Sequence, residues 1–159
     1  MREIPLSQGK TALVDDCNFE ALSKIKWHAK QHGKTFYAEA WQVNESGERK
    51  RVLMHRLILG VKDVKILVDH ADNNGLNNQG ENIRVATRSQ NAMNRSATAK
   101  SKSGIKGVSW SRNKNKWAAY ITGGGKSRFI GYFDCKVDAG KAYDIKAKEY
   151  FGEFAWTNF

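Results

Sequence analysis

Four polar side chains between residues 67 and 95 have the types and spacing of a site for phosphodiester hydrolysis. Asp69 and His70 are adjacent, Asn82 follows twelve residues after the histidine, and Asn91 follows nine residues later. A hard cation such as Mg²⁺ prefers oxygen ligands, and histidine can take a proton from water near neutral pH. The pattern predicts a single metal ion on Asp69 and Asn91, with His70 as general base and Asn82 as the residue that fixes His70.

The same stretch contains the elements that would position these residues. "KILVDH" (65–70) is expected to be a strand, "ADNNGLNNQG" a turn-rich loop, and "ENIRVA" (81–86) a second strand. A helix is expected to begin at Thr87, because Thr87 and Gln90 fit the capping box S/T-x-x-E/Q. At a strand end the chain bends, so the adjacent acid and histidine can reach one site.

These residues, in "MHRLIL", "VDHADNNGLNN" and "ENIRVATRSQNAMNR", resemble the HNH nuclease motif with its ββα-metal fold. The context is similar to that of phage and intron-encoded HNH homing endonucleases. The resemblance implies a metal-dependent, site-specific DNA endonuclease, with Asp69 and Asn91 as metal ligands, His70 as general base and Asn82 as its positioning residue. The family usually has histidine where this chain has Asn91, which favours Mg²⁺, with Mn²⁺ as a substitute, over Zn²⁺ or Ni²⁺.

Other polar residues near this motif have simpler interpretations. Asp72 is a less favoured additional ligand. His55, in "MHR", is either a packed or hydrogen-bonded histidine or a residue close to the phosphate or the base. The remaining asparagines of the loop are expected to be turn residues, because asparagine tolerates the left-handed backbone region: Asn73, Asn74, Asn77 and Asn78.

Positive charge is concentrated in one part of the chain. The net charge is +11, and residues 83–133 contain eleven Lys and Arg but no Asp or Glu. An acid-free block of this length predicts a polyanionic partner, and interleaved aromatic residues favour nucleic acid over a membrane surface. Arg84, Arg88 and Arg95 are expected to contact phosphates, although a basic solvated face would look the same.

The chain divides into sections by its patterns. We expect a β-rich region and nuclease module over 1–95 (core 67–95), a linker over 96–103, and a second domain over 104–159. The first region is predicted to contain strands at 10–15, 35–43 and 49–54, and helices at 15–25 and 54–60. Asp15 or Asp16 is the expected N-cap of the first helix.

The pattern of apolar runs and turn residues over 104–159 predicts three strands followed by one helix. The strands are expected at 106–111, 116–122 and 127–133, with "GGGK" as the hairpin turn between the last two, and the helix at 136–152, capped by Asp134. Alternation along the middle strand predicts that Trp117, Ala119 and Ile121 face the helix and that Ala118, Tyr120 and Thr122 face outward. The helix is expected to bury apolar residues at near-helical spacing: Val137, Ala139, Ala142, Tyr143, Ile145 and Tyr150.

This section resembles the DNA-binding domain of plant ethylene-response (Apetala-type) transcription factors, through "GVSWSRNKNKWAAYI", "FIGYFD" and "AGKAYDIKAKEYFGEFAWTNF". That family places the open face of a three-stranded sheet in the major groove. The resemblance implies DNA contacts at Lys106, Ser109, Ser111, Tyr120, Thr122, Ser127 and Phe129. Most of the arginines that the plant domains have among these positions are replaced here by small or polar residues. Phosphate contacts are expected at Arg112, Lys114, Lys116, Lys126 and Arg128.

The composition limits the remaining possibilities. No apolar run could span a membrane and no secretory signal is visible, so we expect a soluble protein of the cytoplasm of a phage-infected or bacterial cell. Cys17 and Cys135 are expected to be buried thiols. The predicted class is α+β, and the predicted partner is double-stranded DNA, with no obligatory protein partner. The alternatives are a non-catalytic DNA-binding regulator with a vestigial nuclease fold and an RNA-binding structural protein.

Overall fold

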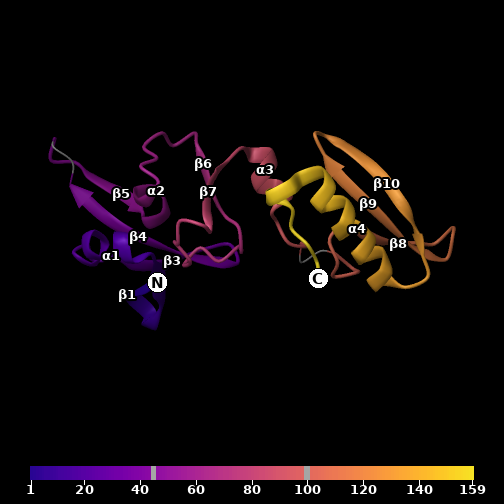
Figure 1. The fold of residues 1–159 in the computed structure, drawn as a ribbon, viewed down its shortest axis with the longest axis horizontal. Helices are drawn as coiled ribbons and strands as arrows, with labels where there is room; N and C mark the ends of the chain where they lie inside the picture. Colours follow the sequence, from indigo (N-terminus) through magenta and orange to yellow (C-terminus); the bar gives the residue numbers. More distant parts are fainter. Residues whose placement is uncertain (44–45, 99–100) are drawn as a thin grey trace. The chain divides into compact units, whose positions relative to one another are not determined.

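The computed structural model describes residues 1–43, 46–98 and 101–159, and it is an α+β protein (Figure 1). The chain forms two compact units, residues 1–87 and 88–159. Each unit is described by itself. The expected linker at 96–103 includes positions 99 and 100, which lie outside the described residues.

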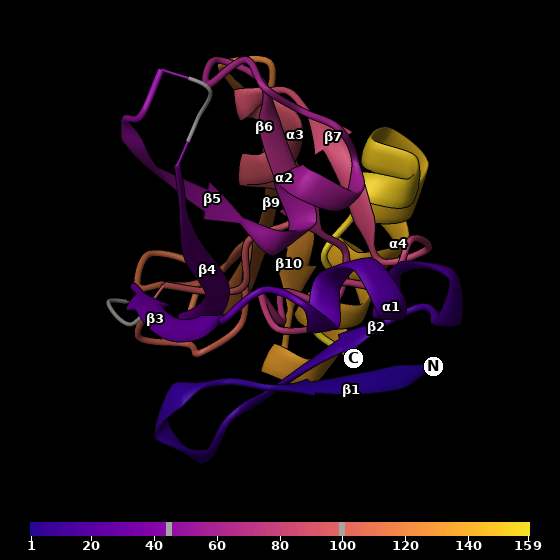
Figure 2. The ribbon, with the colours of Figure 1, turned by 90° about the vertical axis from the view of Figure 1, so that its left-hand side faces the viewer.

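The described residues of the first unit form three small antiparallel sheets. β1 and β2 form a two-stranded ribbon, β3, β4 and β5 form a three-stranded sheet in that order, and β6 and β7 form a second ribbon (Figures 1 and 2). The elements are β1 (Arg2–Pro5), β2 (Thr11–Val14), α1 (Asp16–Ser23), β3 (His28–His32), β4 (Thr35–Val43), β5 (Arg49–Leu53), α2 (Met54–Ile58), β6 (Leu67–His70) and β7 (Ile83–Ala86), with a 3₁₀ turn at Ser7–Gly9.

The core of the first unit combines alternating strand residues with one face of α1. Strand alternation buries every second residue, as at Ala12 and Val14 of β2 and at Ala38 and Ala40 of β4. The indole of Trp27 is buried, and its Nε1 donates to the Leu22 carbonyl at 2.9 Å. The other buried members of this core are Ile4, Leu22 and Met54.

The elements expected for the first unit are present, within a residue or two at most boundaries, but the strands β1 and β3 were not predicted. Asp15 occupies the N-cap position of α1, yet its side chain makes no capping hydrogen bond. Its Oδ2 instead accepts from the Gly80 amide at 2.7 Å. Asp15 therefore ties α1 to the loop between β6 and β7.

The second unit is a three-stranded antiparallel sheet with one long helix on one face (Figure 1). The strand order is β10-β9-β8, and a glycine turn with positive φ at Gly124 and Gly125 joins β9 to β10, as expected. The elements are α3 (Arg88–Met93), β8 (Val108–Ser111), β9 (Lys116–Gly123), β10 (Lys126–Phe133), α4 (Lys136–Phe151) and a 3₁₀ turn at Gly152–Phe154. α3 begins one residue after the predicted cap.

The helix α4 buries a face that carries small residues and one large ring, that of Tyr143. Ala139, Gly140, Tyr143 and Ala147 are buried on this face. Gly107 has φ +75°, and a Cβ on it would lie 2.1 Å from the Tyr143 ring, so this approach requires glycine. The prediction that Ile145 and Tyr150 belong to the core is wrong, because both side chains are exposed.

Buried Asp144 ties the end of the chain to α4. Its Oδ1 accepts from the Asn158 backbone amide at 2.8 Å and from the Asn158 side-chain amide at 2.9 Å, and its Oδ2 accepts from the Phe159 amide at 3.0 Å. The Asn158 side chain in turn bridges to both backbone groups of Lys106. A charged residue on the buried face of α4 thus satisfies backbone donors of the final segment.

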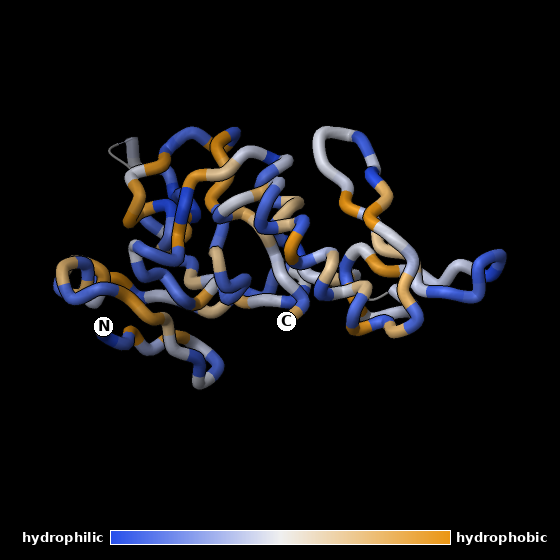
Figure 3. Tube along the Cα trace, turned by 45° about the vertical axis from the view of Figure 1, so that its right-hand side comes forward, coloured by the Kyte–Doolittle hydropathy of each residue, from blue (hydrophilic) through white to orange (hydrophobic). Residues whose placement is uncertain are grey.

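Two sequence expectations about the cysteines and the α4 cap are corrected. The N-cap of α4 is Cys135, whose Sγ accepts from the Val137 amide, whereas Asp134 pairs with Lys116. Cys17 and Cys135 are both exposed and are not buried thiols. Among the described residues, no helix is long and apolar enough to cross a membrane, and apolar segments are short and interrupted along the coloured part of the trace (Figure 3).

Candidate active site

The ribbon β6–β7 positions the predicted acid and histidine. Asp69 pairs across the ribbon with Arg84, and His70 pairs with Ile83. Adjacent strand residues point to opposite faces, so the carboxylate and the imidazole have different neighbours. Both side chains are buried, at 5% and 4% exposure.

The imidazole of His70 is oriented by Asn78. His70 Nε2 lies 3.3 Å from Asn78 Oδ1, and the Asn78 Nδ2 donates to the Leu76 carbonyl at 3.1 Å. The second bond orients the amide so that its oxygen faces the ring. His70 Nε2 must then be the donor, which leaves the basic lone pair on Nδ1.

Aromatic side chains from distant segments enclose the same ring. The ring centroids of His55 and His70 are 4.9 Å apart, and Tyr37 lies 5.6 Å from each, all edge to face. The loop approaches Tyr37 so closely that a Cβ on Gly75 would lie 2.7 Å from its ring. His55 is therefore packed directly against His70, and its buried Nδ1 makes no hydrogen bond within the described part of the chain.

Burial keeps both histidines neutral. Desolvation, with smaller effects from His70 and Arg56, lowers the pKa of His55 to about 3. Burial also lowers the pKa of His70, while the Asn78 hydrogen bond and the carboxylates of Asp72 and Asp69 act in the opposite direction. The pKa of Tyr37 is raised, by burial and then by Asp69.

The neutral state of His55 gives a first prediction, for stability in acid. The unfolded chain has a histidine pKa near 6.5, so between pH 6.5 and about 3 it binds a proton that the folded protein does not. This contribution to stability is complete above pH 6.5 and is lost as the pH falls. His55→Phe keeps the ring but cannot be protonated. At pH 5 it should therefore recover about 2 kcal/mol of the acid-induced loss, at about 1.4 kcal/mol per pH unit below 6.5.

Urea unfolding near neutral pH and at about pH 5 measures this difference, with the partly exposed His28→Phe as the matched control. An equally steep acid dependence in His55→Phe and in the unmodified protein would contradict the neutral, buried state of His55.

Asn82 organises the loop that follows His70. Its Oδ1 accepts from the Asp72 amide at 3.0 Å, and its Nδ2 donates to Asp72 Oδ1 at 2.9 Å and to the Asn77 carbonyl at 2.7 Å. Asp72 also accepts from the Asn74 amide and from the Asn77 side chain. The carboxylate of Asp72 is thus engaged within the loop, and Asn82 fixes the chain on both sides of the turn.

Asp69 already has a cationic partner. Its Oδ2 accepts from Arg84 Nη2 at 2.9 Å and from Arg84 Nε at 3.2 Å. The guanidinium is mostly buried, with 16% of the side chain exposed. Arg84 is thus held by the carboxylate that the sequence predicts as a metal ligand, and it is not an exposed phosphate contact in this structure.

The remaining residues predicted for the nuclease site lie in the second unit. Asn91 is half-buried on α3, and Arg88 and Arg95 are exposed at or near its two ends. Within the described residues, no group of three or more His, Cys, Asp or Glu side chains could hold a metal ion. Asp69, His70 and Asn82 thus lie on the β6–β7 ribbon and its loop in the first unit, each with different partners, and the metal-ligand role of Asn91 remains a prediction.

The residues predicted to contact DNA through the sheet have different environments. By register, the face of the sheet opposite α4 carries Ser109, Ser111, Tyr120, Thr122, Ser127 and Phe129. Ala118 lies on the same face but is buried, because its methyl group is shorter than the neighbouring rings. Arg112 and Lys114 lie in the exposed turn between β8 and β9.

Three of the predicted basic contacts have partners within the protein. Arg128 lies on the α4 side of the sheet, 5.2 Å from the centre of the Tyr150 ring. Lys116 pairs with Asp134 at 3.1 Å. Lys106 donates to the Met93 carbonyl, and burial lowers its pKa to about 8.

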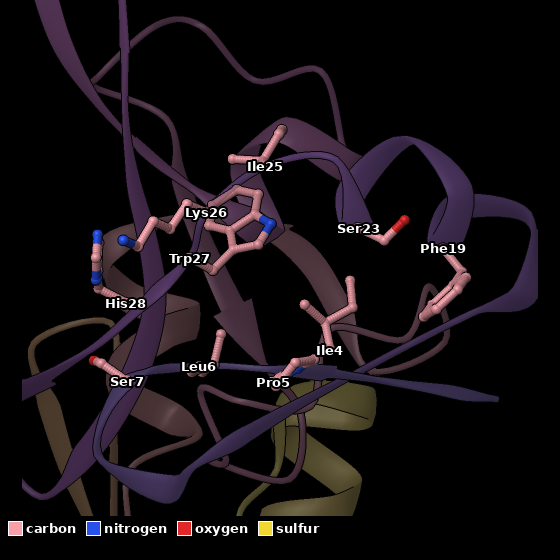
Figure 4. Close-up of a pocket in the computed structure, with 10 residues that line it drawn as sticks. All are labelled: Ile4, Pro5, Leu6, Ser7, Phe19, Ser23, Ile25, Lys26, Trp27 and His28. Carbon is pink, nitrogen blue, oxygen red and sulfur yellow. The ribbon is translucent and has the colours of Figure 1, made fainter.

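A pocket elsewhere in the first unit lacks comparable chemistry. It has a volume of about 380 Å³ and is lined mainly by apolar side chains of β1, α1 and the segment leading into β3, including Ile4, Phe19 and Trp27 (Figure 4). Lys26 and His28 are its ionisable lining residues. The candidate active site is therefore the β6–β7 ribbon and its loop.

Sequence reasoning missed two residues of this site. Asn78 was assigned to a turn together with its neighbours, because nothing in the sequence separates it from Asn73, Asn74 and Asn77. Tyr37 lies on β4, more than thirty residues before His70, and its near-alternating strand pattern indicates only a strand. Both contacts depend on the tertiary structure.

The candidate site is thus a buried acid and a buried histidine on an antiparallel ribbon, followed by a loop held by hydrogen bonds of Asn82. An uncharacterized HNH endonuclease of Acanthamoeba polyphaga mimivirus is 32% identical over 151 residues, which cover 95% of this chain and 76% of the viral protein. Protein 3.8 of Escherichia phage T7 is 32% identical over 88 residues, 55% of this chain and 72% of the phage protein. No family model matches the chain. The chain belongs to the HNH endonuclease family.

Proposed function

We propose that this protein is a metal-dependent, site-specific DNA endonuclease of the homing type, and that His70 is its general base. The observation that carries the proposal is the state of His70. The side chain is buried, enclosed by Tyr37 and His55, and oriented through Nε2 by Asn78. A neutral imidazole with a fixed lone pair is the form that accepts a proton from water.

In the proposed reaction, the lone pair on His70 Nδ1 takes a proton from the water whose oxygen bonds to the scissile phosphorus. The P–O bond to one nucleotide oxygen breaks, and that oxygen leaves and takes up a proton from solvent. Asn78 and the two aromatic rings hold the imidazole in place during this transfer. Asn82 keeps the loop after His70 in one conformation, through its bonds to Asp72 and Asn77. Positioning of this kind lowers the barrier by removing motions that the reactants would otherwise lose in the transition state.

Asp69 and Asn91 are the proposed ligands of a divalent metal in a ββα-metal module. The chemistry of Asp69 fits this role, because its carboxylate is buried and already binds a cation, the Arg84 guanidinium. Oxygen donors favour Mg²⁺, with Mn²⁺ as a substitute. When bound, such a metal stabilises negative charge on the phosphate. Release of Arg84 from Asp69 would make the guanidinium available to the DNA.

The second unit is the proposed DNA anchor. Residues 104–159 form a sheet and helix as the resemblance to the Apetala-type domain implies, and the proposed organisation is a nuclease region (1–95), a linker (96–103) and this domain. The absence of acids from residues 83–133 supports binding to the phosphates of double-stranded DNA. Exposed cations at the turns, Arg112, Lys114 and Lys126, are best placed for this role.

One observation favours a second candidate, a DNA-binding regulator that no longer cuts. The Asp69–Arg84 ion pair could be a permanent structural contact. Incubation with supercoiled plasmid and Mg²⁺, beside a sample containing EDTA, separates the two functions. We expect nicked or linear plasmid only when the metal is present. Tight binding to DNA without any cleavage, with Mg²⁺ or Mn²⁺, would establish the regulator instead.

A further inference from the structure

Three exposed aromatic rings lie together on the open face of the second unit's sheet. Tyr120, Phe129 and Tyr132 are 37%, 51% and 41% exposed. The centroids of Tyr120 and Phe129 are 5.3 Å apart, and those of Phe129 and Tyr132 are 4.8 Å apart. We call these three residues the aromatic face. It lies opposite α4, which covers the other side of the sheet.

A register shift in β10 creates this grouping. Phe129 pairs with Tyr120, but Gly131 pairs with Ala119 and Tyr132 with Ala118, so Ile130 is the extra residue of a bulge. Without the bulge, the next residue after Phe129 on the open side would be Gly131. The shift places Gly131, next to core-facing Ile130, on the α4 side of the sheet and brings Tyr132 onto the open side beside Phe129.

The polar groups of this face suit the reading of base edges poorly. Its hydrogen-bonding residues are short hydroxyl side chains, and two of them bond to each other, Thr122 to Ser127 at 3.2 Å. Base edges in the major groove are read chiefly by arginine, lysine, asparagine and glutamine. By register, Lys116 is the one such residue on the strands of this face, and it lies at the sheet's end in an ion pair with Asp134.

Aromatic rings bind the flat faces of bases. In a duplex these faces are covered by the neighbouring base pairs, and only an unpaired strand presents them. Cations lie at both ends of β9, with Arg112 and Lys114 in the turn before it and Lys126 in the strand after it. They can contact the phosphates on either side of the stacked bases, in a region of the sequence without acids.

We infer that the aromatic face is a stacking platform for the unpaired bases of single-stranded DNA. The inference rests on the proposed function only in taking DNA as the partner. Ends that fray at a cleaved site present such a strand. The platform would hold unpaired bases while the basic turns hold the phosphates of the same strand.

Fluorescence anisotropy of the whole protein in EDTA tests the inference. The probe is labelled oligo-thymidylate, compared with the same strand in a duplex and with oligo-uridylate. The variants are Tyr120→Leu, Phe129→Leu and Tyr132→Leu, and the matched control is Tyr150→Leu, an exposed aromatic residue on α4. Thermal unfolding of each variant shows that it is folded.

Each leucine variant should lose about tenfold in affinity for the single strand, the effect of one lost base stack, and little for the duplex. Tyr150→Leu should bind normally, and Phe129→Trp should retain binding. The inference is overturned if the leucine variants bind the single strand like the unmodified protein, or if the unmodified protein prefers oligo-uridylate to oligo-thymidylate. If a leucine variant fails to fold, the tryptophan emission of Phe129→Trp tests the platform instead. Oligo-thymidylate should quench this emission, and unchanged emission overturns the inference.

The plasmid assay keeps this result separate from the proposed function. Both proposals are supported if the variants lose single-strand binding and the unmodified protein nicks the plasmid. A protein that binds oligo-thymidylate through these rings but never cuts plasmid refutes the endonuclease and leaves the platform standing.

Discussion

The variant His70→Ala is expected to cut DNA about 10²–10⁴ times more slowly than the unmodified protein, the usual cost of losing a general base. Its affinity for DNA should be unchanged, because His70 is buried beneath Tyr37 and His55 and carries no net charge. Single-turnover cleavage of a labelled duplex measures the rate of the chemical step, and anisotropy in EDTA measures the affinity.

Added imidazole makes this experiment specific to proton transfer. The alanine variant leaves space beside Asn78, which small exogenous imidazole can enter to restore part of the rate. The control is His28→Ala, another partly buried histidine of the same unit that lies outside the candidate site. Cleavage by His70→Ala within a few-fold of the unmodified rate would remove His70 from the mechanism.

The sequence predicted the parts of the site that depend on local patterns. Two strands follow from short apolar runs bounded by turn residues: the first ends in Asp69 and His70, and the second contains Arg84. The observed strands β6 and β7 lie within the expected ranges. The pairing of Asp69 with Arg84 was not predicted, because register depends on how the intervening loop closes. That loop is set by the contacts of Asp72 and Asn82, which involve side chains ten residues apart.

Residues brought in from distant segments could not be predicted from local patterns. The role of His55 was left open because its neighbours, Tyr37 and His70, come from other strands. In the second unit, alternation correctly placed Ala119 and Ile121 in the core. The helical spacing of apolar residues failed for Ile145 and Tyr150 of α4, which are exposed, and Tyr150 contacts the Arg128 guanidinium instead.

The second large effect is expected for Asp69→Asn, which should abolish metal-dependent cleavage. The substitution keeps the size of the side chain and its ability to accept a hydrogen bond from Arg84, but it removes the negative charge that would attract a divalent cation. A metal at a phosphate supplies several kcal/mol of transition-state stabilisation, so the rate should fall about 10³-fold or more. Cleavage with Mg²⁺ and with Mn²⁺, together with Mn²⁺ titration by calorimetry, measures both the activity and the binding.

Arg84→Gln is the matched variant, because it leaves the Asp69 carboxylate intact and removes its internal cation. In this variant no guanidinium competes with Mn²⁺ for Asp69 Oδ2. The metal should therefore bind more tightly than in the unmodified protein. The variant should cleave DNA more slowly than the unmodified protein if Arg84 contacts the phosphate once it is released from Asp69. Thermal unfolding checks that each variant is folded, since a buried charge left without its partner costs stability. Full cleavage by Asp69→Asn, or by the unmodified protein in excess EDTA, would refute the assignment of a metal to Asp69.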